Sequence, residues 1–309
     1  MTRRYPLSDA MQAFVVRTQS MAVASPTLAA QREGYLRMAE AFCPPRPAGL
    51  CISELLLEGL PEIRLYRPAS LAPESGWPTV LYLHGGGWTL GNAGSHDVIC
   101  AELAAQLQAL VVAVSYRLAP EHPYPAALHD CRIVWQRLRS GSLGEPVDIA
   151  RLVVAGDSAG GNLSAALCLA LRDTGEPLPG AQALIYPALG DQPTPSRTQC
   201  ANAPLLTREE VDNCLNAYLS RPADRRDPLA LPLMAEDLRG LPPAFIAVAE
   251  FDPLRDDGAL YRDRLRAAGV DVEYFAGPGL VHGCLRAHDV AEVVQLRVAL
   301  LAFLRRHLR

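Results

Sequence analysis

The sequence contains no lysine: its 29 basic residues are all arginine, and they are scattered along the chain. With 33 acidic residues the formal net charge is −4, which gives no electrostatic basis for binding nucleic acid or an anionic membrane. No run of about 18 apolar residues occurs, and Gln12 and Arg17 interrupt the apolar residues near the N-terminus. We therefore predict a cytoplasmic protein with neither a nucleic-acid partner nor a membrane partner.

The sequence also lacks the short motifs that hold metals, phosphates and redox disulfides. Its eight cysteines include no C-x-x-C pair, and there is no H-E-x-x-H motif. No glycine-rich loop matches a Walker or dinucleotide-binding pattern. We expect the cysteines to be free thiols, several of them buried, and we expect no metal and no cofactor.

Short apolar runs alternate with helical stretches along most of the 309 residues. The runs cover 79–83, 110–114, 152–155, 183–186 and 244–248, and the helical stretches cover 96–108, 125–139, 159–172, 255–268 and 290–308. Continuous apolar runs are typical of parallel strands that are covered on both faces. The alternation predicts an α/β fold with a doubly wound, mostly parallel sheet flanked by helices, and residues 52–58 and 62–66 add a hairpin-like edge.

Two segments fall outside this alternation. Residues 1–45 have helical spacing, with Ser25-Pro26 as a plausible helix start, and a proline-rich cluster ends them. The second segment separates the runs 183–186 and 244–248 by more than fifty residues, and its clear helix, 208–219, has a capping box at its start. We predict an N-terminal cap segment at 1–45, a main domain at 46–309, and a cap insertion within it at about 188–225.

The stretch Gly156-Asp157-Ser158-Ala159-Gly160 fits the G-x-S-x-G pattern of a nucleophile elbow. A buried run precedes it and a helical stretch follows it, as a strand-turn-helix elbow requires. The glycines allow strand and helix to pass closely beside a strained serine. The helix that follows points its free N–H groups at the serine, where negative charge develops during acyl transfer.

A second glycine-rich stretch, His84-Gly85-Gly86-Gly87, follows the apolar run 79–83. Without side chains, its backbone N–H groups can face a pocket and form an oxyanion hole with the N–H that follows the nucleophile. His84 is expected to brace this loop rather than to take part in the chemistry.

Four stretches together resemble the bacterial hormone-sensitive-lipase-like esterases (family IV carboxylesterases), which have the α/β-hydrolase fold. They are the two glycine motifs, Tyr116-Arg117-Leu118-Ala119-Pro120-Glu121-His122-Pro123, and Asp252-Pro253-Leu254-Arg255-Asp256 with His282-Gly283. The similarity spans about residues 50–300. It implies that Ser158 is the nucleophile, Asp252 the orienting acid and His282 the general base. It also implies that Gly85, Gly86 and Ala159 supply the oxyanion N–H groups. Residues 116–123 match the family but carry no evident chemistry, and we expect them to be scaffold that positions the loop beneath the elbow.

The order Ser158, Asp252, His282 is independently the order that α/β-hydrolases require. Both Asp252 and His282 follow strand-like runs, at the edge of the sheet where Ser158 is presented. The competing residues have simpler interpretations, as helix caps, helix-start residues or a solvent-facing side chain: Asp256, Asp257, His96, Asp97 and His288.

Trp88 and Cys284 are the expected pocket residues. Cys284 stands where the family has an aromatic residue after His-Gly, so a thiol there would leave room for a bulkier group on the substrate. The alternative is that Cys284 is a small core residue.

We predict a serine carboxylesterase that hydrolyses small, uncharged, short-to-medium acyl esters through an acyl-enzyme. The alternatives are an amidase or formamidase with the same triad, and a non-catalytic small-ligand receptor on the same fold, similar to the gibberellin receptors. Those receptors lack the catalytic histidine, so His282 favours an enzyme. A homodimer paired along residues 271–275 is a further possibility.

Overall fold

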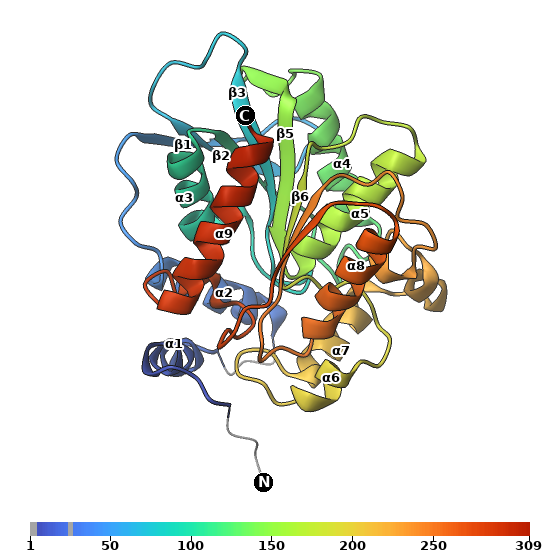
Figure 1. The fold of residues 1–309 in the computed structure, drawn as a ribbon. Helices are drawn as coiled ribbons and strands as arrows, with labels where there is room; N and C mark the ends of the chain where they lie inside the picture. The colour runs from blue at the N-terminus through green and yellow to red at the C-terminus, as the bar shows by residue number, and fades with distance from the viewer. Residues whose placement is uncertain (1–4, 24–26) are drawn as a thin grey trace.

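The computed structural model describes residues 5–23 and 27–309. Within these ranges eight strands form one sheet in the order β1-β2-β4-β3-β5-β6-β7-β8 (Figure 1). The strands are β1 (Leu50–Leu55), β2 (Glu62–Pro68), β3 (Trp77–Leu83), β4 (Leu110–Ser115), β5 (Val147–Asp157), β6 (Gln182–Ile185), β7 (Ala244–Ala247) and β8 (Val272–Phe275). The hairpin β1–β2 joins β4 antiparallel, and every other neighbouring pair is parallel. This confirms the predicted mostly parallel sheet with a hairpin at its edge.

Helices cover both faces of the sheet. They are α3 (Asp97–Leu107) and α9 (Ala291–His307) on one face, and α4 (Ala126–Arg139), α5 (Ala159–Asp173) and α8 (Arg255–Ala267) on the other. Two apolar clusters result, one on each side of the central strands. Leu103 and Leu300 belong to one cluster, and Val134 and Leu167 belong to the other. The continuous apolar runs of the sequence are therefore explained by burial on both faces.

The strand β5 is longer than its apolar run. It begins at Val147, because Trp77 of β3 pairs with Val147 before the register shifts. Asp148 and Arg151 interrupt the apolar residues at the start of β5, so the apolar run alone does not extend back to Val147.

The N-terminal segment forms two helices, α1 (Asp9–Ser20) and α2 (Leu28–Ala41). The predicted helix start at Ser25-Pro26 lies outside the described residues. Met11, Phe14 and Val15 of α1 are buried against the cluster that contains α3 and α9.

The long insertion between β6 and β7 carries α6 (Pro195–Gln199) and α7 (Arg208–Tyr218), followed by the short helices η2 (Pro222–Arg226) and η3 (Pro232–Met234). The predicted capping box is present, because Thr207 Oγ1 accepts the N–H of Glu210 and the Glu210 carboxylate accepts the N–H of Thr207. Figure 1 shows α1, α2, α6 and α7 at the same end of the molecule.

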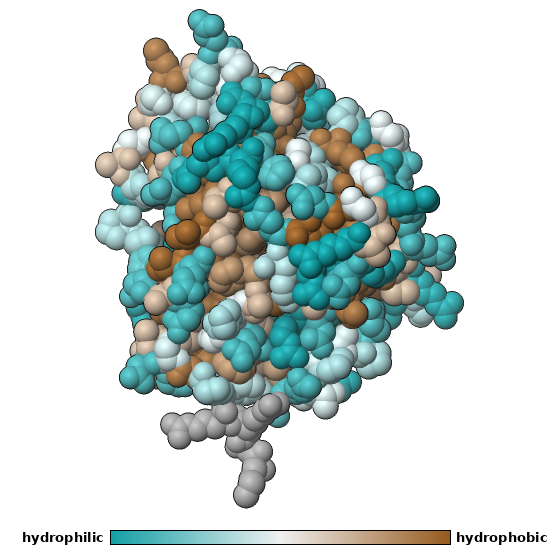
Figure 2. All heavy atoms as spheres, in the orientation of Figure 1, coloured by the Kyte–Doolittle hydropathy of each residue, from teal (hydrophilic) through white to brown (hydrophobic). Residues whose placement is uncertain are grey.

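All eight cysteines are free, and five of them are buried. None of the helices within 5–23 and 27–309 is long and apolar enough to cross a bilayer. On the face drawn in Figure 2, hydrophobic surface is divided into small areas by hydrophilic side chains.

Candidate active site

The nucleophile elbow lies between the last residue of β5, Asp157, and the first residue of α5, Ala159. Ser158 between them has φ 54° and ψ −118°, a strained conformation for a residue with a side chain. The flanking glycines are needed for close approach: a Cβ on Gly156 would lie 2.4 Å from the Gly160 oxygen, and one on Gly160 would lie 1.9 Å from the Leu83 oxygen. Sterics thus dictate the small residues of the motif.

The structure brings Ser158, His282 and Asp252 together in a chain of hydrogen bonds. Ser158 Oγ lies 2.8 Å from His282 Nε2, and His282 Nδ1 lies 2.7 Å from Asp252 Oδ2. Asp252 is completely buried, and its second oxygen accepts the N–H of Leu254 at 2.7 Å. Asp252 follows β7 and His282 follows β8, so both lie at the carboxyl edge of the sheet beside the elbow. With Nδ1–H donating to the carboxylate, Nε2 is free to accept the hydroxyl proton.

The two competing acids hold the insertion in place. Asp256 accepts the N–H of Ser196 at 2.7 Å. Asp257 is buried, accepts the N–H groups of residues 189 and 190 at 3.0 Å each, and pairs with Arg197 at 3.2 Å. Burial raises the pKa of Asp257 to about 6, against the opposing effect of Arg197. Neither carboxylate contacts His282, and the expected role as simple helix caps misses their contacts with the insertion.

The oxyanion loop differs from the expectation at one residue. The N–H of Gly85 donates to Asp157 Oδ1 at 3.0 Å, so it is not available to a substrate, and the assignment of Gly85 as an oxyanion donor is wrong. Gly85 is buried, whereas Gly86 and Gly87 are half-buried and line the cavity above Ser158. Neither of their N–H groups has an acceptor within the described part of the chain. Ala159 is the first residue of α5, so its N–H has no partner within the helix.

Asp157 binds three donors around the back of the elbow. Tyr82 Oη donates to it at 2.9 Å, His96 Nε2 lies 3.2 Å away, and Gly85 supplies the third contact. Burial alone would raise the pKa of Asp157, but His96 and the Tyr82 hydroxyl lower it to about 2. His96 is therefore more than the helix-start residue that we expected, because it contacts the elbow directly.

His84 supports the same loop. Its Nδ1 lies 2.8 Å from the Gly85 oxygen, and its ring stacks on Tyr116 with centroids 4.2 Å apart. Burial lowers the pKa of His84 to about 3, so the ring is neutral. Tyr116 Oη donates to the His84 oxygen at 2.7 Å, and Ala119 N–H donates to the Trp88 oxygen at 2.9 Å. These contacts place residues 116–119 directly against the loop.

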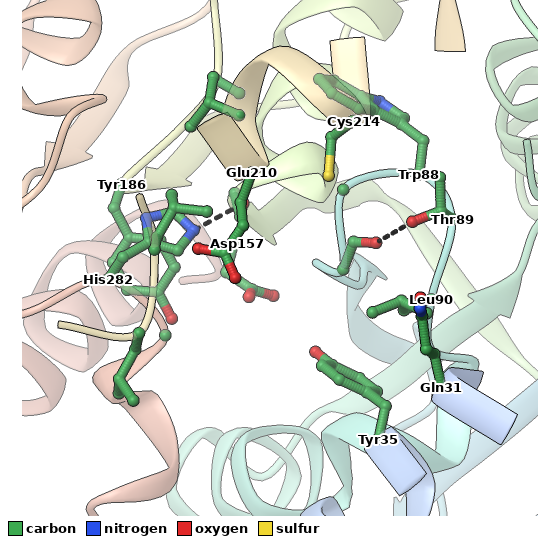
Figure 3. A pocket seen from close by; sticks show the side chains of 18 of the residues that line it. Gln31, Tyr35, Trp88, Thr89, Leu90, Asp157, Tyr186, Glu210, Cys214 and His282 are labelled. Atoms are coloured by element: carbon green, nitrogen blue, oxygen red, sulfur yellow. Dashed lines mark hydrogen bonds between the residues drawn. The ribbon is translucent and has the colours of Figure 1, made fainter. Parts of the chain in front are cut away.

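A cavity of about 820 Å³ opens above Ser158 and His282 (Figure 3). Its walls include the glycine loop, parts of residues 18–23 and 28–38, and parts of residues 203–217. The two segments expected to cap the site thus both contribute wall residues. Figure 3 shows Tyr35 reaching into the cavity from one side and Cys214 and Trp88 on another.

Only one of the two expected pocket residues lines this cavity. Trp88 does, although its ring is buried and stacks on Tyr218 at 4.4 Å. Cys284 does not: it is completely buried in the apolar cluster with Val281 and Leu285, and burial raises the pKa of its thiol to about 12. The expectation that Cys284 walls the pocket is wrong, since the short helix η4 (Cys284–Arg286) turns this side chain into the core.

Several wall residues had no sequence signal that we recognised: Gln31, Tyr35, Glu210, Cys214 and Arg286. Over the described ranges, no group of three or more His, Cys, Asp or Glu side chains is arranged to hold a metal ion.

Comparison with known proteins agrees with this geometry. The family model described as alpha/beta hydrolase fold matches residues 80–286. The chain is 46% identical over 235 residues to carboxylesterase NlhH of Mycobacterium tuberculosis, covering 73% of this chain and 72% of that protein. It is 36% identical over 249 residues to ethyl acetate hydrolase of Pseudomonas putida, covering 78% of each.

Solved structures are similar over nearly the whole chain. The hyperthermophilic esterase of Pyrobaculum calidifontis superposes with a TM-score of 0.88 at 33% identity, covering 98% of this chain and 99% of that one. The S159A mutant of esterase rPPE superposes with a TM-score of 0.91 at 29% identity, covering 99% of each chain. The chain therefore belongs to the α/β-hydrolase family that includes these carboxylesterases.

Proposed function

We propose that this carboxylic ester hydrolase works through an acyl-enzyme formed on Ser158. The observation that carries the proposal is the continuous chain from Ser158 Oγ through His282 to the buried carboxylate of Asp252, at 2.8 and 2.7 Å. Ser158 Oγ attacks the ester carbonyl carbon while His282 Nε2 takes its proton. Asp252 holds the imidazole in the required tautomer and stabilises the imidazolium that forms.

The tetrahedral intermediate carries a negative charge on the former carbonyl oxygen. We assign its stabilisation to the N–H groups of Gly86, Gly87 and Ala159, which face the cavity or begin α5 beside Ser158. His282 then gives its proton to the leaving alcohol oxygen. In the second half a water loses its proton to His282 and attacks the acyl carbon, and Ser158 is released with its hydroxyl restored.

The substrate class follows from the cavity and from the relatives. A volume of about 820 Å³ with mixed apolar and polar walls suits small esters of short-to-medium acyl chains. The names of the relatives point the same way, since they include ethyl acetate hydrolase, arylesterase and acetyl esterase. Residues 1–45 and about 188–225 serve as the cap over this cavity, so deleting residues 1–40 should change the ester preference while the sheet still folds.

The two alternatives are less well supported. A receptor does not need Ser158 hydrogen-bonded to His282 and His282 hydrogen-bonded to a buried carboxylate, and an amidase does not fit the names of the relatives. Turnover of p-nitrophenyl acetate against p-nitroacetanilide separates the three functions. We expect fast ester hydrolysis and little anilide hydrolysis. Dominant anilide hydrolysis would contradict the proposal in favour of an amidase, and binding without turnover would favour a receptor.

A cytoplasmic location and a homodimer paired along β8 stay predictions from the sequence. Size-exclusion chromatography with light scattering tests the dimer, which a monomer at all concentrations would exclude.

A further inference from the structure

The charged side chains that line the cavity differ in their partners. Asp157 is held by Tyr82 and His96, and Arg197 pairs with Asp257. The carboxylate of Glu210 caps its own helix, accepting both the N–H and the hydroxyl of Thr207 at 2.7 and 2.8 Å. Arg286 differs from Arg197, the other arginine of the lining, because it forms no ion pair with any carboxylate in the described part of the chain.

Arg286 lies close to the reacting groups. It ends η4, four residues after His282. A Cβ placed on Gly283 would lie 3.7 Å from Arg286 Nη1, so the guanidinium passes beside the residue that follows the proposed base. Its charge also reaches the elbow, where it contributes to lowering the pKa of Asp157.

The other neighbour of Arg286 is Tyr35 of α2. Nη2 donates to Tyr35 Oη, and the guanidinium carbon stands 4.7 Å from the centre of the tyrosine ring. Figure 3 shows Tyr35 extending into the cavity. Burial raises the pKa of Tyr35, so its hydroxyl stays protonated and keeps one proton to donate. Tyr35 therefore orients the guanidinium but brings no negative charge.

Most donors of Arg286 are unused. A guanidinium has five N–H groups, and the described structure gives a partner only to Nη2; Nε is buried without a hydrogen-bond partner. An unpaired cation in a partly buried wall carries an unfavourable desolvation free energy unless a bound ligand supplies the opposite charge. The planar fork of an arginine matches the two oxygens of a carboxylate, and the free Tyr35 proton adds a further donor.

We propose that Arg286 and Tyr35 form a carboxylate subsite, and that the preferred substrates are small esters carrying a free carboxylate. The inference rests on the proposed function of Ser158. It revises the expectation of uncharged substrates, since no motif in the sequence marks Arg286. The carboxylate belongs either to the acid part, as in a hemiester of a dicarboxylic acid, or to the alcohol part, as in an acylated hydroxy acid.

Two matched substrate pairs test the subsite and distinguish these sources. The acid-side pair is monoethyl glutarate and ethyl pentanoate, and the alcohol-side pair is 4-acetoxybutanoate and butyl acetate. Within each pair the chains are similar and one member carries a carboxylate. We expect a higher kcat/KM for the charged member of at least one pair. In Arg286→Gln the ratio of charged to neutral kcat/KM should fall by about 10- to 100-fold, the usual worth of a charge-assisted bidentate contact.

The matched control is Arg239→Gln, because Arg239 is exposed and pairs with Asp237 far from the cavity wall. Its substrate ratios should equal those of the unmodified protein. A second readout needs no variant: glutarate should inhibit hydrolysis of ethyl pentanoate competitively, and the uncharged glutaramide should not. Tyr35→Phe should weaken inhibition by glutarate less than Arg286→Gln does.

The inference is overturned if a folded Arg286→Gln keeps the same ratio of charged to neutral kcat/KM. It is also overturned if glutarate and glutaramide inhibit equally. A preference of the unmodified protein for the neutral member of both pairs would overturn it too, and in that case fast neutral turnover would leave the proposed function of Ser158 intact. If no ester of either kind is hydrolysed, the proposed function fails and the subsite falls with it.

Discussion

Gly85 donates its backbone N–H to the carboxylate of Asp157 across 3.0 Å, which ties the glycine loop to the nucleophile elbow. The same carboxylate is bound by Tyr82 and His96, so one buried charge fixes the positions of two segments that lie 72 residues apart. The contact turns Gly85 away from the substrate and leaves the next two glycines to face it. Asp157 is thus a positioning residue for the proposed oxyanion hole.

Because Asp157 is ionised in these contacts, we predict that it makes the free energy of unfolding depend on pH. The pKa of Asp157 is about 2 in the folded protein and 3.8 ordinarily, so the ionised form favours folding. Its contribution is complete above about pH 4, is lost as the pH falls toward 2, and amounts to about 2 kcal/mol. In Asp157→Asn the free energy of unfolding should therefore fall less steeply between about pH 5 and pH 2. Urea unfolding at several pH values measures this.

The control for that series is Asp173→Asn, which alters an exposed carboxylate. It should keep the pH dependence of the unmodified protein. The same slope in Asp157→Asn as in the unmodified protein would mean that Asp157 is not stabilised by its ionisation.

Gly86→Ala should lower kcat by about 10²- to 10³-fold, the usual cost of losing one oxyanion donor. Gly86 has φ 121°, and an added Cβ would lie 2.3 Å from the Leu90 oxygen, so the loop has to move. Gly94→Ala is the control, because its Cβ would make only an ordinary contact, 3.5 Å from Asn92 Oδ1. Steady-state kinetics on p-nitrophenyl acetate measures both. Equal activity of the two variants would refute the assignment of Gly86.

Asp252→Asn should lower kcat by on the order of 10⁴-fold with little loss of stability. An asparagine can keep the contact with the N–H of Leu254 but favours the wrong tautomer of His282. Asp256→Asn is the comparison, since Asp256 binds Ser196 and not the histidine. The acid would be misassigned if Asp256→Asn lost more activity than Asp252→Asn.

Cys284→Phe should reduce the free energy of unfolding by about 1–3 kcal/mol, because a ring has to enter a filled core. The site is completely buried among apolar side chains and does not border the cavity. The order of preference along a series of p-nitrophenyl esters should therefore stay the same. A shift of the best ester to a shorter chain at unchanged melting temperature would place the thiol in the pocket after all.

Local patterns were sufficient for the sheet, and the motifs that carry the family resemblance were sufficient for the three residues that the structure joins by hydrogen bonds. The elbow around Ser158 can be recognised in the sequence because only glycine fits sterically at positions 156 and 160. Asp252 and His282 were assigned from the family resemblance, and their positions agree with it because each follows a strand and the carboxyl ends of parallel strands share one edge.

Other features depend on contacts between distant segments or on the direction of one side chain. The pairing of Gly85 with Asp157 could not be deduced from either motif, since any glycine of the loop could have faced the substrate. The burial of Cys284 depends on how a single short helix turns after His282. Arg286 is marked by no sequence pattern, because the proposed role depends on its contact with Tyr35 of α2 and on its having no carboxylate partner among the described residues.

The central claim is that Ser158 is the nucleophile of an ester hydrolase, and covalent labelling tests it most directly. A p-nitrophenyl alkylphosphonate should abolish esterase activity while adding one phosphonyl group per chain, and peptide mass spectrometry should place that group on Ser158. Ser158→Ala should take up no label and lose about 10⁶-fold in kcat, because hydroxyl and base act as a unit. A label on any other residue, or substantial turnover by Ser158→Ala, would contradict the account.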